Sequence, residues 1–502
     1  MRMSARPRLA HYGLFLALGT AGCRPDTAVT VPTEGSQPPE TATTPSPVVT
    51  EANCPRGLSA RARCGSVKVF ENRATASGRT IDLAFVVLPP KNADEAQPDP
   101  VFVLAGGPGQ AATQALPIAG ASLARANETR PLVFVDQRGT GASNGLQCVP
   151  ESLDAMLRGP WHPDNHAFLR QCRDELPADL TQYATPTAMD DLDDVRAALG
   201  YDTINLWGGS YGTRAGLAYI RQHGEHVRSA VLWGVAPPGQ PFPATFAPVG
   251  QAAFERLIAD CAADAGCARV LPDGAATLDR ILDRLAKAPA EVTVTDPRTK
   301  QPATITLTRE MFADGLRLTL YDASWSAGLP AMLTAADAGN YEPMLSLMVP
   351  LTVAIISQIH LGMFLSVACS EDIPLLTTAT DDAARGTFMG TAPLDGLRHA
   401  CEPWPRAALP TEYLEPVTSD VPVLLMAGEL DPVTPPATAR SAASTLSNSR
   451  VVALPNVGHG TSNARECESS LTGRFFENPE PAALDDACTA GLSRPPFAVP
   501  PG

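Results

Sequence analysis

Three residues of the types that perform nucleophilic catalysis each stand just beyond a predicted strand. Ser210 follows the apolar run 204–207, Asp431 follows the run 423–426, and His459, the last histidine of the chain, follows the run 451–454. A serine hydroxyl becomes a nucleophile when an imidazole takes its proton and a carboxylate orients that imidazole. The order Ser, Asp, His therefore predicts covalent hydrolysis of an acyl substrate, with Ser210 as nucleophile, His459 as base and Asp431 as the acid behind it.

The serine lies in a G-x-S-x-G pattern, Gly208-Gly209-Ser210-Tyr211-Gly212, between an apolar strand and a predicted helix. Glycines suit such a sharp turn because its crowded backbone leaves no room for side chains, and the turn exposes the serine hydroxyl. The backbone N–H of Tyr211, at the start of the helix, is then a predicted donor to a developing oxyanion. The pattern alone also fits an ordinary glycine-rich turn, so the surrounding motifs decide.

Two of those motifs supply the remaining groups that the reaction needs. Gly106-Gly107-Pro108-Gly109 follows the run 101–104, where a second oxyanion donor is expected. Proline has no N–H, which makes Gly107 the predicted donor. Asp431 is preferred to Glu429 as the acid because Glu429 comes too early after its strand and is expected to be solvated.

The elements that must position these residues alternate between apolar strands and helices, which predicts a mostly parallel sheet with its functional loops at the carboxyl edge. The predicted strands are 67–70, 81–88, 101–104, 132–135, 204–207, 230–234, 421–425 and 451–454. A helix is predicted over 188–199, capped by Thr187 and closed by Gly200. Its acids, 190, 191, 193 and 194, are interpreted as favourable charges near a helix N-terminus.

The rhythm breaks between residues 240 and 415, which are helix-prone apart from a weak strand pair at 292–295 and 305–307. An insertion at this place predicts a cap over the site that gates access and shapes the pocket. Within it, 343–370 carries no charge except that of His360, and its length would allow a transmembrane helix. Pro350 and the polar residues of its second half favour packed cap helices instead.

The N-terminal 23 residues predict an export signal. Three arginines precede a short apolar stretch, and Thr20-Ala21-Gly22-Cys23 resembles the lipoprotein box of bacteria, in which the cysteine is acylated. The alternative is an ordinary cleaved signal with Cys23 incidental. The expected location is the periplasm or cell envelope as a lipoprotein anchored through Cys23, and otherwise the outside of the cell. Residues 24–52, rich in Pro, Thr, Ser and Glu, predict a disordered tether.

The rest of the chain divides into a first core part at 53–239, the cap at 240–415 and a second core part at 416–502. Ten of the eleven cysteines lie beyond the signal. As near neighbours they suggest five disulfides, as in exported proteins: Cys54/Cys64, Cys148/Cys172, Cys261/Cys267, Cys369/Cys401 and Cys467/Cys488. Sequence alone does not fix this connectivity. Zinc ligation would need C-x-x-C pairs or clustered histidines, so no metal or cofactor is expected.

The charge balance excludes nucleic acid as a partner. The chain has 53 Asp+Glu against 38 Lys+Arg, a net charge of −15, and no run of basic residues. The partner expected from the motifs is instead a peptide or small acyl substrate.

Together the motifs resemble the prolyl iminopeptidase and tripeptidyl aminopeptidase branch of the α/β-hydrolases. The resemblance covers about 60–490 and rests on the Gly-Gly-Pro-Gly loop at 106–109, Asp136-Gln137-Arg138-Gly139-Thr140-Gly141 with Ser143, the serine turn, the stretch 428–436 and Gly458-His459-Gly460. It implies an α/β-hydrolase fold with a large helical cap inserted before the strand that bears the acid, and a C-terminal region like that of tripeptidyl aminopeptidases. Ala105 and Tyr211 stand where prolyl iminopeptidases usually have His and Trp, which favours the secreted tripeptidyl-type relatives.

The resemblance implies an exported serine aminopeptidase that releases N-terminal proline or short peptides through an acyl-enzyme. Such an enzyme must recognise a free ammonium, and Glu371 and Asp372, just after Cys369, are the candidate carboxylates; a surface acidic pair is the alternative. A carboxylesterase with the same triad and an apolar pocket under 343–370 is the competing function. A hydrolase fold that only binds is disfavoured by the complete triad.

Overall fold

The computed structural model describes residues 48–54, 58, 61–159, 162 and 165–499. The predicted export signal, with Cys23, lies outside the described residues. So does the predicted tether as far as residue 47.

A nine-stranded sheet forms the centre of the molecule, in the order β1-β2-β3-β5-β4-β6-β7-β10-β11. From β5 to β11 neighbouring strands run parallel, and the pairs β1–β2, β2–β3 and β3–β5 are antiparallel. The strands are β1 (Val49–Ala52), β2 (Arg63–Phe70), β3 (Thr80–Leu88), β4 (Val101–Leu104), β5 (Leu132–Val135), β6 (Ile204–Gly209), β7 (Val227–Trp233), β10 (Val423–Gly428) and β11 (Ser449–Leu454). The predicted, mostly parallel sheet is confirmed.

The first strand corrects the boundary of the predicted tether. Residues 49–52 form β1, whose Val49 is in register with Val67 of β2. The segment has little apolar surface to bury, but the edge of a sheet offers unpaired backbone groups that a short extended segment can bond. Composition alone did not show this, because the stabilising bonds are made by the backbone.

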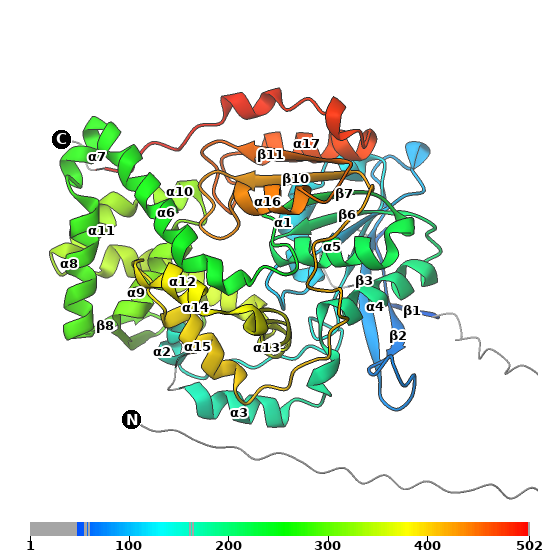
Figure 1. The fold of residues 1–502 in the computed structure, drawn as a ribbon, viewed down its shortest axis with the longest axis horizontal. Coiled ribbons are helices and arrows are strands. Elements are labelled where there is room, and N and C mark those ends of the chain that lie inside the picture. The colour runs from blue at the N-terminus through cyan, green and yellow to red at the C-terminus, as the bar shows by residue number, and fades with distance from the viewer. Residues whose placement is uncertain (1–47, 55–57, 59–60, 160–161, 163–164, 500–502) are drawn as a thin grey trace, which may run out of the picture. The chain divides into compact units, whose positions relative to one another are not determined.

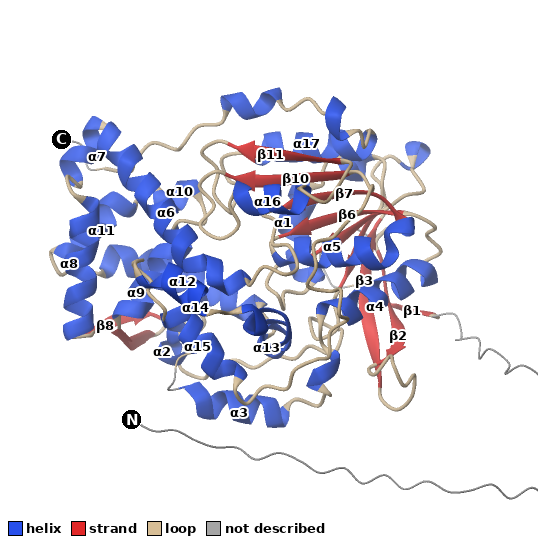
Figure 2. Ribbon diagram, viewed as in Figure 1, coloured by secondary structure: helices blue, strands red, loops and turns tan. Residues whose placement is uncertain are grey.

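Helices cover both faces of the sheet because alternate residues of each strand point to opposite sides (Figure 2). One face packs Phe102, Leu206 and Leu425 against α4 (Thr185–Ala198), α5 (Tyr211–His223) and α16 (Pro436–Ala443). The other packs Val103, Trp207 and Leu424 against α1 (Ala112–Ser122) and α17 (Arg465–Glu477). All of these strand residues are buried.

The predicted helical cap lies between β7 and β10, beyond the carboxyl ends of the parallel strands (Figure 1). The weak strand pair is confirmed as the antiparallel hairpin β8 (Ala290–Thr295) and β9 (Pro302–Leu307). The cap helices are α6 (Phe242–Ala263), α7 (Ala265–Val270), α8 (Gly274–Lys287), α9 (Arg309–Thr319), α10 (Ala323–Ser326), α11 (Leu329–Asp337), α12 (Glu342–Gln358), α13 (Leu361–Val367), α14 (Thr378–Arg385) and α15 (Ala392–Cys401).

The uncharged stretch 343–370 is divided between α12, α13 and the following π-helical turn Ala368–Asp372. Met344, Met348 and Val353 of α12 are buried in the cap core. Among the helices of the described residues, none is long and apolar enough to span a membrane.

Two segments outside 240–415 also pack with the cap. Leu153, Met156 and Leu157 of α2 (Leu153–Arg158), which precedes α3 (His166–Glu175), belong to the cap's apolar core. At the other end, the chain leaves α17 and reaches α7, as the red segment of Figure 1 shows. There the N–H of Ala498 donates to the carbonyl of Ala327 over 3.0 Å.

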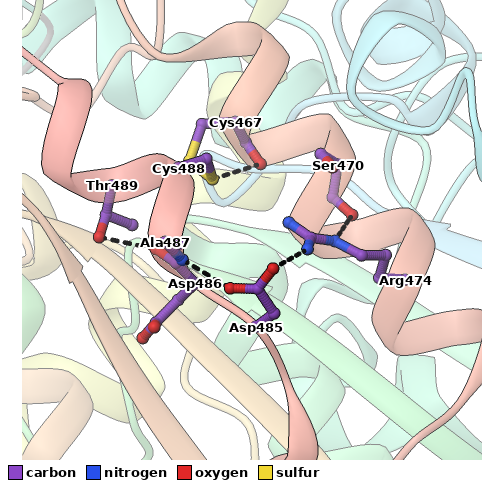
Figure 3. The surroundings of a disulfide bond; sticks show 8 residues. All are labelled: Cys467, Ser470, Arg474, Asp485, Asp486, Ala487, Cys488 and Thr489. Atoms are coloured by element: carbon purple, nitrogen blue, oxygen red, sulfur yellow. Dashed lines mark hydrogen bonds and ion pairs between the residues drawn. A yellow bond between two sulfur atoms is a disulfide. The ribbon is translucent and has the colours of Figure 1, made fainter.

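All five predicted disulfides are present, with the predicted pairing. Figure 3 shows Cys467–Cys488, which joins α17 to the C-terminal segment. Beside it, Arg474 of the helix donates to Asp485 over 3.0 Å. Five disulfides are typical of proteins that mature in an oxidising compartment, outside the cytoplasm.

Candidate active site

Ser210 occupies a strained turn between β6 and α5. Its φ of +55° and ψ of −124° place a non-glycine residue in a region that side chains disfavour. Its N–H donates to the carbonyl of Trp233 over 2.8 Å, and its own carbonyl accepts from the N–H and hydroxyl of Thr213. A Cβ on Gly212 would lie 2.1 Å from the carbonyl oxygen of Leu104, so the following turn of helix requires glycine. The turn has the conformation that the motif predicts.

His459 and Asp431 form a hydrogen-bonded pair, with 2.8 Å between Nδ1 and Oδ2. Asp431 is 2% exposed, and its other oxygen accepts the N–H groups of Val433 and Thr434. Burial alone would raise the pKa of Asp431, but His459 and the N–H and hydroxyl of Thr434 hold it below its ordinary value. The carboxylate is therefore kept ionised opposite the imidazole. Glu429, the rejected rival, is exposed.

The end of β7 brings the serine and the histidine to one place. Trp233 accepts the N–H of Ser210 and donates its indole N–H to the carbonyl of His459 over 2.9 Å. At the next residue, a Cβ added to Gly234 would lie 3.0 Å from Cε1 of His459. Residues 233 and 234 thus contact both the nucleophile turn and the imidazole, as the parallel-sheet prediction requires.

The glycine loop 106–109 lies beside Ser210. A Cβ built on Gly106 would lie 3.4 Å from the Cβ of Ser210. Gly107 and Gly109 have φ values of +110° and +100°, which side-chain-bearing residues rarely adopt. Tyr211, whose N–H is the other predicted donor, buries its ring, and its hydroxyl contacts Gln137 at 3.0 Å and Thr185 at 2.7 Å.

The Asp-Gln-Arg-Gly motif builds the wall behind this loop. Asp136 accepts the N–H and hydroxyl of Thr113, at the start of α1, and the N–H of Ala142. Arg138 is fully buried and makes a two-pronged ion pair with Asp191 of α4. The interpretation of Asp191 as a helix-end charge is wrong: α4 begins at Thr185, so Asp191 lies in its middle and faces a buried guanidinium.

Glu371 and Asp372, the candidate ammonium ligands, lie in a buried network around Arg214 of α5. Asp372 accepts from Arg214 over 2.9 Å and from the N–H of Phe242 over 2.9 Å. Glu371 accepts from both the N–H and hydroxyl of Thr185 and from the hydroxyl of Tyr413 over 2.6 Å, with Arg214 3.5 Å away. Both carboxylates are 2% exposed or less.

Those partners already bond both oxygens of Glu371, and the carboxylate is buried. Burial raises the pKa of Glu371, and Arg214, Tyr413 and Thr185 oppose that rise. The role of this pair in amine recognition stays a prediction, and the surface alternative is wrong because neither side chain is at the surface.

Comparison with known proteins identifies the family. The sequence profile of the α/β-hydrolase fold matches residues 99–462, more than half of the chain. The chain belongs to the α/β-hydrolase family. The predicted fold, including the cap before the strand that bears Asp431, is thereby confirmed.

Relatives of this α/β-hydrolase include peptidases. The serine protease Hip1 of Mycobacterium tuberculosis is 34% identical over 180 residues, which are 32% of this chain and 35% of the relative. The tripeptidyl aminopeptidase of Streptomyces lividans is 28% identical over 193 residues, 36% of each chain. The matches span about a third of the length of these curated relatives. A solved proline iminopeptidase of Mycobacterium smegmatis is 18% identical, with a TM-score of 0.42, over 83% of this chain and 99% of its own. The family match and the two peptidase relatives support a hydrolase.

The cap contacts the loop that bears His459 directly. The ring of Tyr321, two residues after α9, meets that of His459 edge-on, with 5.1 Å between centroids, and its carbonyl accepts the N–H of Gly460 over 2.7 Å. A Cβ on Gly458 would lie 2.4 Å from that carbonyl oxygen. The glycines on both sides of His459 therefore permit the close approach of the cap.

A cavity of about 380 Å³ lies between the cap helices. Apolar side chains form most of its wall, among them Phe246, Met311, Ile355 and Leu397. Arg317 also lines it and donates to the hydroxyl of Tyr321 over 2.9 Å. Arg317 and Tyr321 thus connect the wall of the cavity to His459. A pocket of this size and character suits a small organic ligand.

Two residues of the site escaped sequence analysis. The hydroxyl of Thr434 bonds Oδ2 of Asp431 over 2.8 Å and lies 3.1 Å from Nδ1 of His459. Its position three residues after the acid was the available signal. Arg214 had another, since it lies four residues after Ser210 and therefore one helical turn further along the same face. Among the described residues, no group of three or more His, Cys, Asp or Glu side chains could hold a metal ion.

Proposed function

We propose that this protein is an exported serine aminopeptidase that releases N-terminal residues, proline or short peptides, through an acyl-enzyme on Ser210. The observation that carries the proposal is the Asp431–His459 pair, which meets the nucleophile turn at the end of β7. The aminopeptidase assignment is supported by the tripeptidyl aminopeptidase relative and by the family resemblance of the loops.

In the proposed reaction, His459 Nε2 takes the proton of the Ser210 hydroxyl as its oxygen attacks the scissile carbonyl. Asp431 holds Nδ1–H and stabilises the imidazolium. The N–H groups of Gly107 and Tyr211 bind the oxyanion of the tetrahedral intermediate. His459 then gives its proton to the leaving amine, and a water molecule, activated by the same imidazole, hydrolyses the ester on Ser210.

Chromogenic amides of proline and of tripeptides with free N-termini test the proposal. The wild type should hydrolyse them and react with a fluorophosphonate at Ser210. Ser210→Ala should lose labelling and about 10⁶-fold in kcat, as loss of a catalytic serine does elsewhere. Undiminished turnover by this variant would remove Ser210 from the mechanism. A wild type that is labelled but cleaves only blocked peptides or esters would contradict the aminopeptidase assignment.

The cap cavity favours a second candidate, a carboxylesterase with the same three residues. Its largely apolar wall suits the acyl or alcohol chain of an ester. Cleavage of medium-chain p-nitrophenyl esters without cleavage of any peptide amide would favour this function.

Export and anchoring are part of the same proposal. The disulfides support export, and the box ending at Cys23 suggests acylation there. The mass of the mature N-terminus, measured from a bacterial host that processes lipoproteins, tests this. An acylated Cys23 is expected, whereas a free N-terminus downstream of it would indicate an ordinary cleaved signal.

A further inference from the structure

A short piece of the cap lies against the oxyanion loop. Ile359 and His360 join α12 to α13, and Ile359 forms an isolated antiparallel bridge with Gln110, the residue after the glycine loop. The side-chain amide of Gln110 donates to that of Gln358 over 2.8 Å. At this point the cap is bonded to the core immediately beside the proposed oxyanion donor Gly107.

His360 makes the central contacts of this junction. Its backbone N–H and its Nδ1–H both donate to the carbonyl of Gly109, over 2.9 and 3.0 Å. On the other side of the ring, Nε2 accepts the N–H of Gly141 over 3.0 Å. One imidazole therefore bridges the glycine loop, which follows β4, and the Asp-Gln-Arg-Gly loop, which follows β5.

The glycines of both loops fit closely around this histidine. A Cβ on Gly109 would lie 2.8 Å from the carbonyl oxygen of His360, and one on Gly145 would lie 2.9 Å from its ring. His360 itself is only 7% exposed. Gly109 thus allows its loop to approach the backbone of His360, and Gly145 allows the second loop to approach the ring.

The bonding pattern also determines the protonation state of His360. Gly109 needs a donor at Nδ1, and Gly141 needs an acceptor at Nε2, so the ring must be neutral with its proton on Nδ1. Burial lowers the pKa of His360, opposed by its bond to Gly109 and by Asp136, the charged side chain that acts on it. A second proton, on Nε2, would point at the N–H of Gly141 and break that hydrogen bond.

We infer that His360 is a positioning residue of the reaction, which holds the 106–109 loop so that the N–H of Gly107 is aimed at the oxyanion. The inference rests on the proposed function, because it assigns the loop to transition-state binding. Loss of an oxyanion donor costs about 10²–10³ in kcat, and a displaced donor costs part of that. His360 carries no proton to or from the substrate.

Three variants test the inference. His360→Ala removes both side-chain bonds, keeps the backbone bond to Gly109, and should lower kcat by about 10–100-fold with less than about threefold change in KM. His360→Asn can keep the donor to Gly109, and His360→Gln can keep an acceptor near Gly141, so each should recover part of the loss. Asp260→Asn is the matched control, because Asp260 pairs the cap with Arg494 far along the chain from these loops. It should leave kcat unchanged.

The pH profile separates positioning from mere structural support. As the pH falls below the pKa of His360, log kcat of the wild type should fall with a steeper slope than that of His360→Gln, because His360 takes a proton. His360→Gln cannot titrate at this position, so its slope should be smaller by one. Identical slopes, or an unchanged kcat in His360→Ala at temperatures where it is folded, would overturn the inference.

Hydrogen exchange supplies a measurement that does not need activity. Peptides covering 105–115 and 136–147 should exchange faster in His360→Ala than in the wild type, and no faster in Asp260→Asn. Unchanged exchange would mean that His360 does not hold these two loops, and it would overturn the inference whatever the kinetics show. A wild type that cleaves no substrate while these peptides respond would contradict the proposed function, and with it the catalytic purpose of the contact.

Discussion

Two centres bury carboxylates around the nucleophile turn, and they differ in the cation that each one faces. Asp431 faces an imidazole, which gains and loses its proton during the proposed reaction. Glu371 and Asp372 face Arg214, which stays charged throughout. The pKa of Asp431 is lowered and that of Glu371 is raised.

The difference shows how similar residue types serve different purposes. A carboxylate that is ionised beside a titratable partner can stabilise a transient positive charge. Two carboxylates that share one permanently charged guanidinium cannot stabilise a transient charge in this way. Removing one member of such a group chiefly leaves a buried charge without its partner. We therefore expect the first centre to govern turnover and the second to govern stability.

The largest effect should come from Asp431→Asn. The amide cannot stabilise the imidazolium and favours the wrong tautomer of His459, so kcat should fall about 10⁴-fold with a folded protein and similar KM. Steady-state kinetics on the best chromogenic amide measure this. Glu429→Gln, two residues earlier and exposed, is the matched control and should leave kcat unchanged. Comparable losses in both variants would remove the distinction between these acids.

Arg214→Met should act on stability instead. It leaves Glu371 and Asp372 buried without their cation, and breaking a buried ion pair in this way costs about 3–5 kcal/mol in the free energy of unfolding. Urea unfolding with the disulfides intact measures it. Adding Glu371→Gln and Asp372→Asn should restore much of the loss. If the single variant were as stable as the wild type, the network would not be a structural centre.

A third buried carboxylate, Glu468 of α17, has hydroxyl partners, Ser122 at 2.9 Å and Thr461 at 3.4 Å. Burial raises its pKa to about 7. The folded state holds this proton more tightly than the unfolded chain. The contribution of Glu468 to the free energy of unfolding is therefore full below about pH 4.5 and is lost as the pH rises to about 7. That window corresponds to about 3 kcal/mol, since one pKa unit is about 1.4 kcal/mol.

Glu468→Gln should abolish this pH dependence. Urea unfolding of wild type and variant is measured across pH 4.5–8. As the pH rises, the free energy of unfolding of the variant should increasingly exceed that of the wild type. Glu477→Gln, an exposed acid on the same helix, should follow the wild type. Parallel curves for Glu468→Gln and the wild type would mean that Glu468 ionises without cost.

The sequence predicted the parts of this architecture that local pattern determines. Apolar runs located β4 and β5 at their observed bounds, and cysteine spacing anticipated all five disulfides. The glycine turn and the chain order Ser, Asp, His predicted that Ser210, Asp431 and His459 lie at the same edge of the sheet, where β6, β10 and β11 end. Each of these signals is short in sequence or repeats with a fixed period.

Contacts between distant segments left no comparable signal. Asp191 looked like one of several helix-end acids until α4 proved to begin at Thr185 and Arg138 proved to be its partner. His360 was a lone histidine in an apolar stretch, and its two loops lie more than 200 residues away. Such pairings depend on how elements dock, which residue type and spacing do not encode locally.

The smallest effect, and the sharpest test of the comparison, is expected from Glu371→Gln. From sequence alone, this variant should lose peptide cleavage and keep ester cleavage, because the carboxylate would bind the substrate ammonium. The structure gives both Glu371 oxygens to Thr185 and Tyr413 instead. We therefore expect kcat/KM to fall by less than about tenfold, or about 1.4 kcal/mol, and equally for peptide and ester. A loss confined to free-amine peptides would restore the amine-binding role, because a purely structural defect acts on the shared triad and cannot distinguish the two substrates.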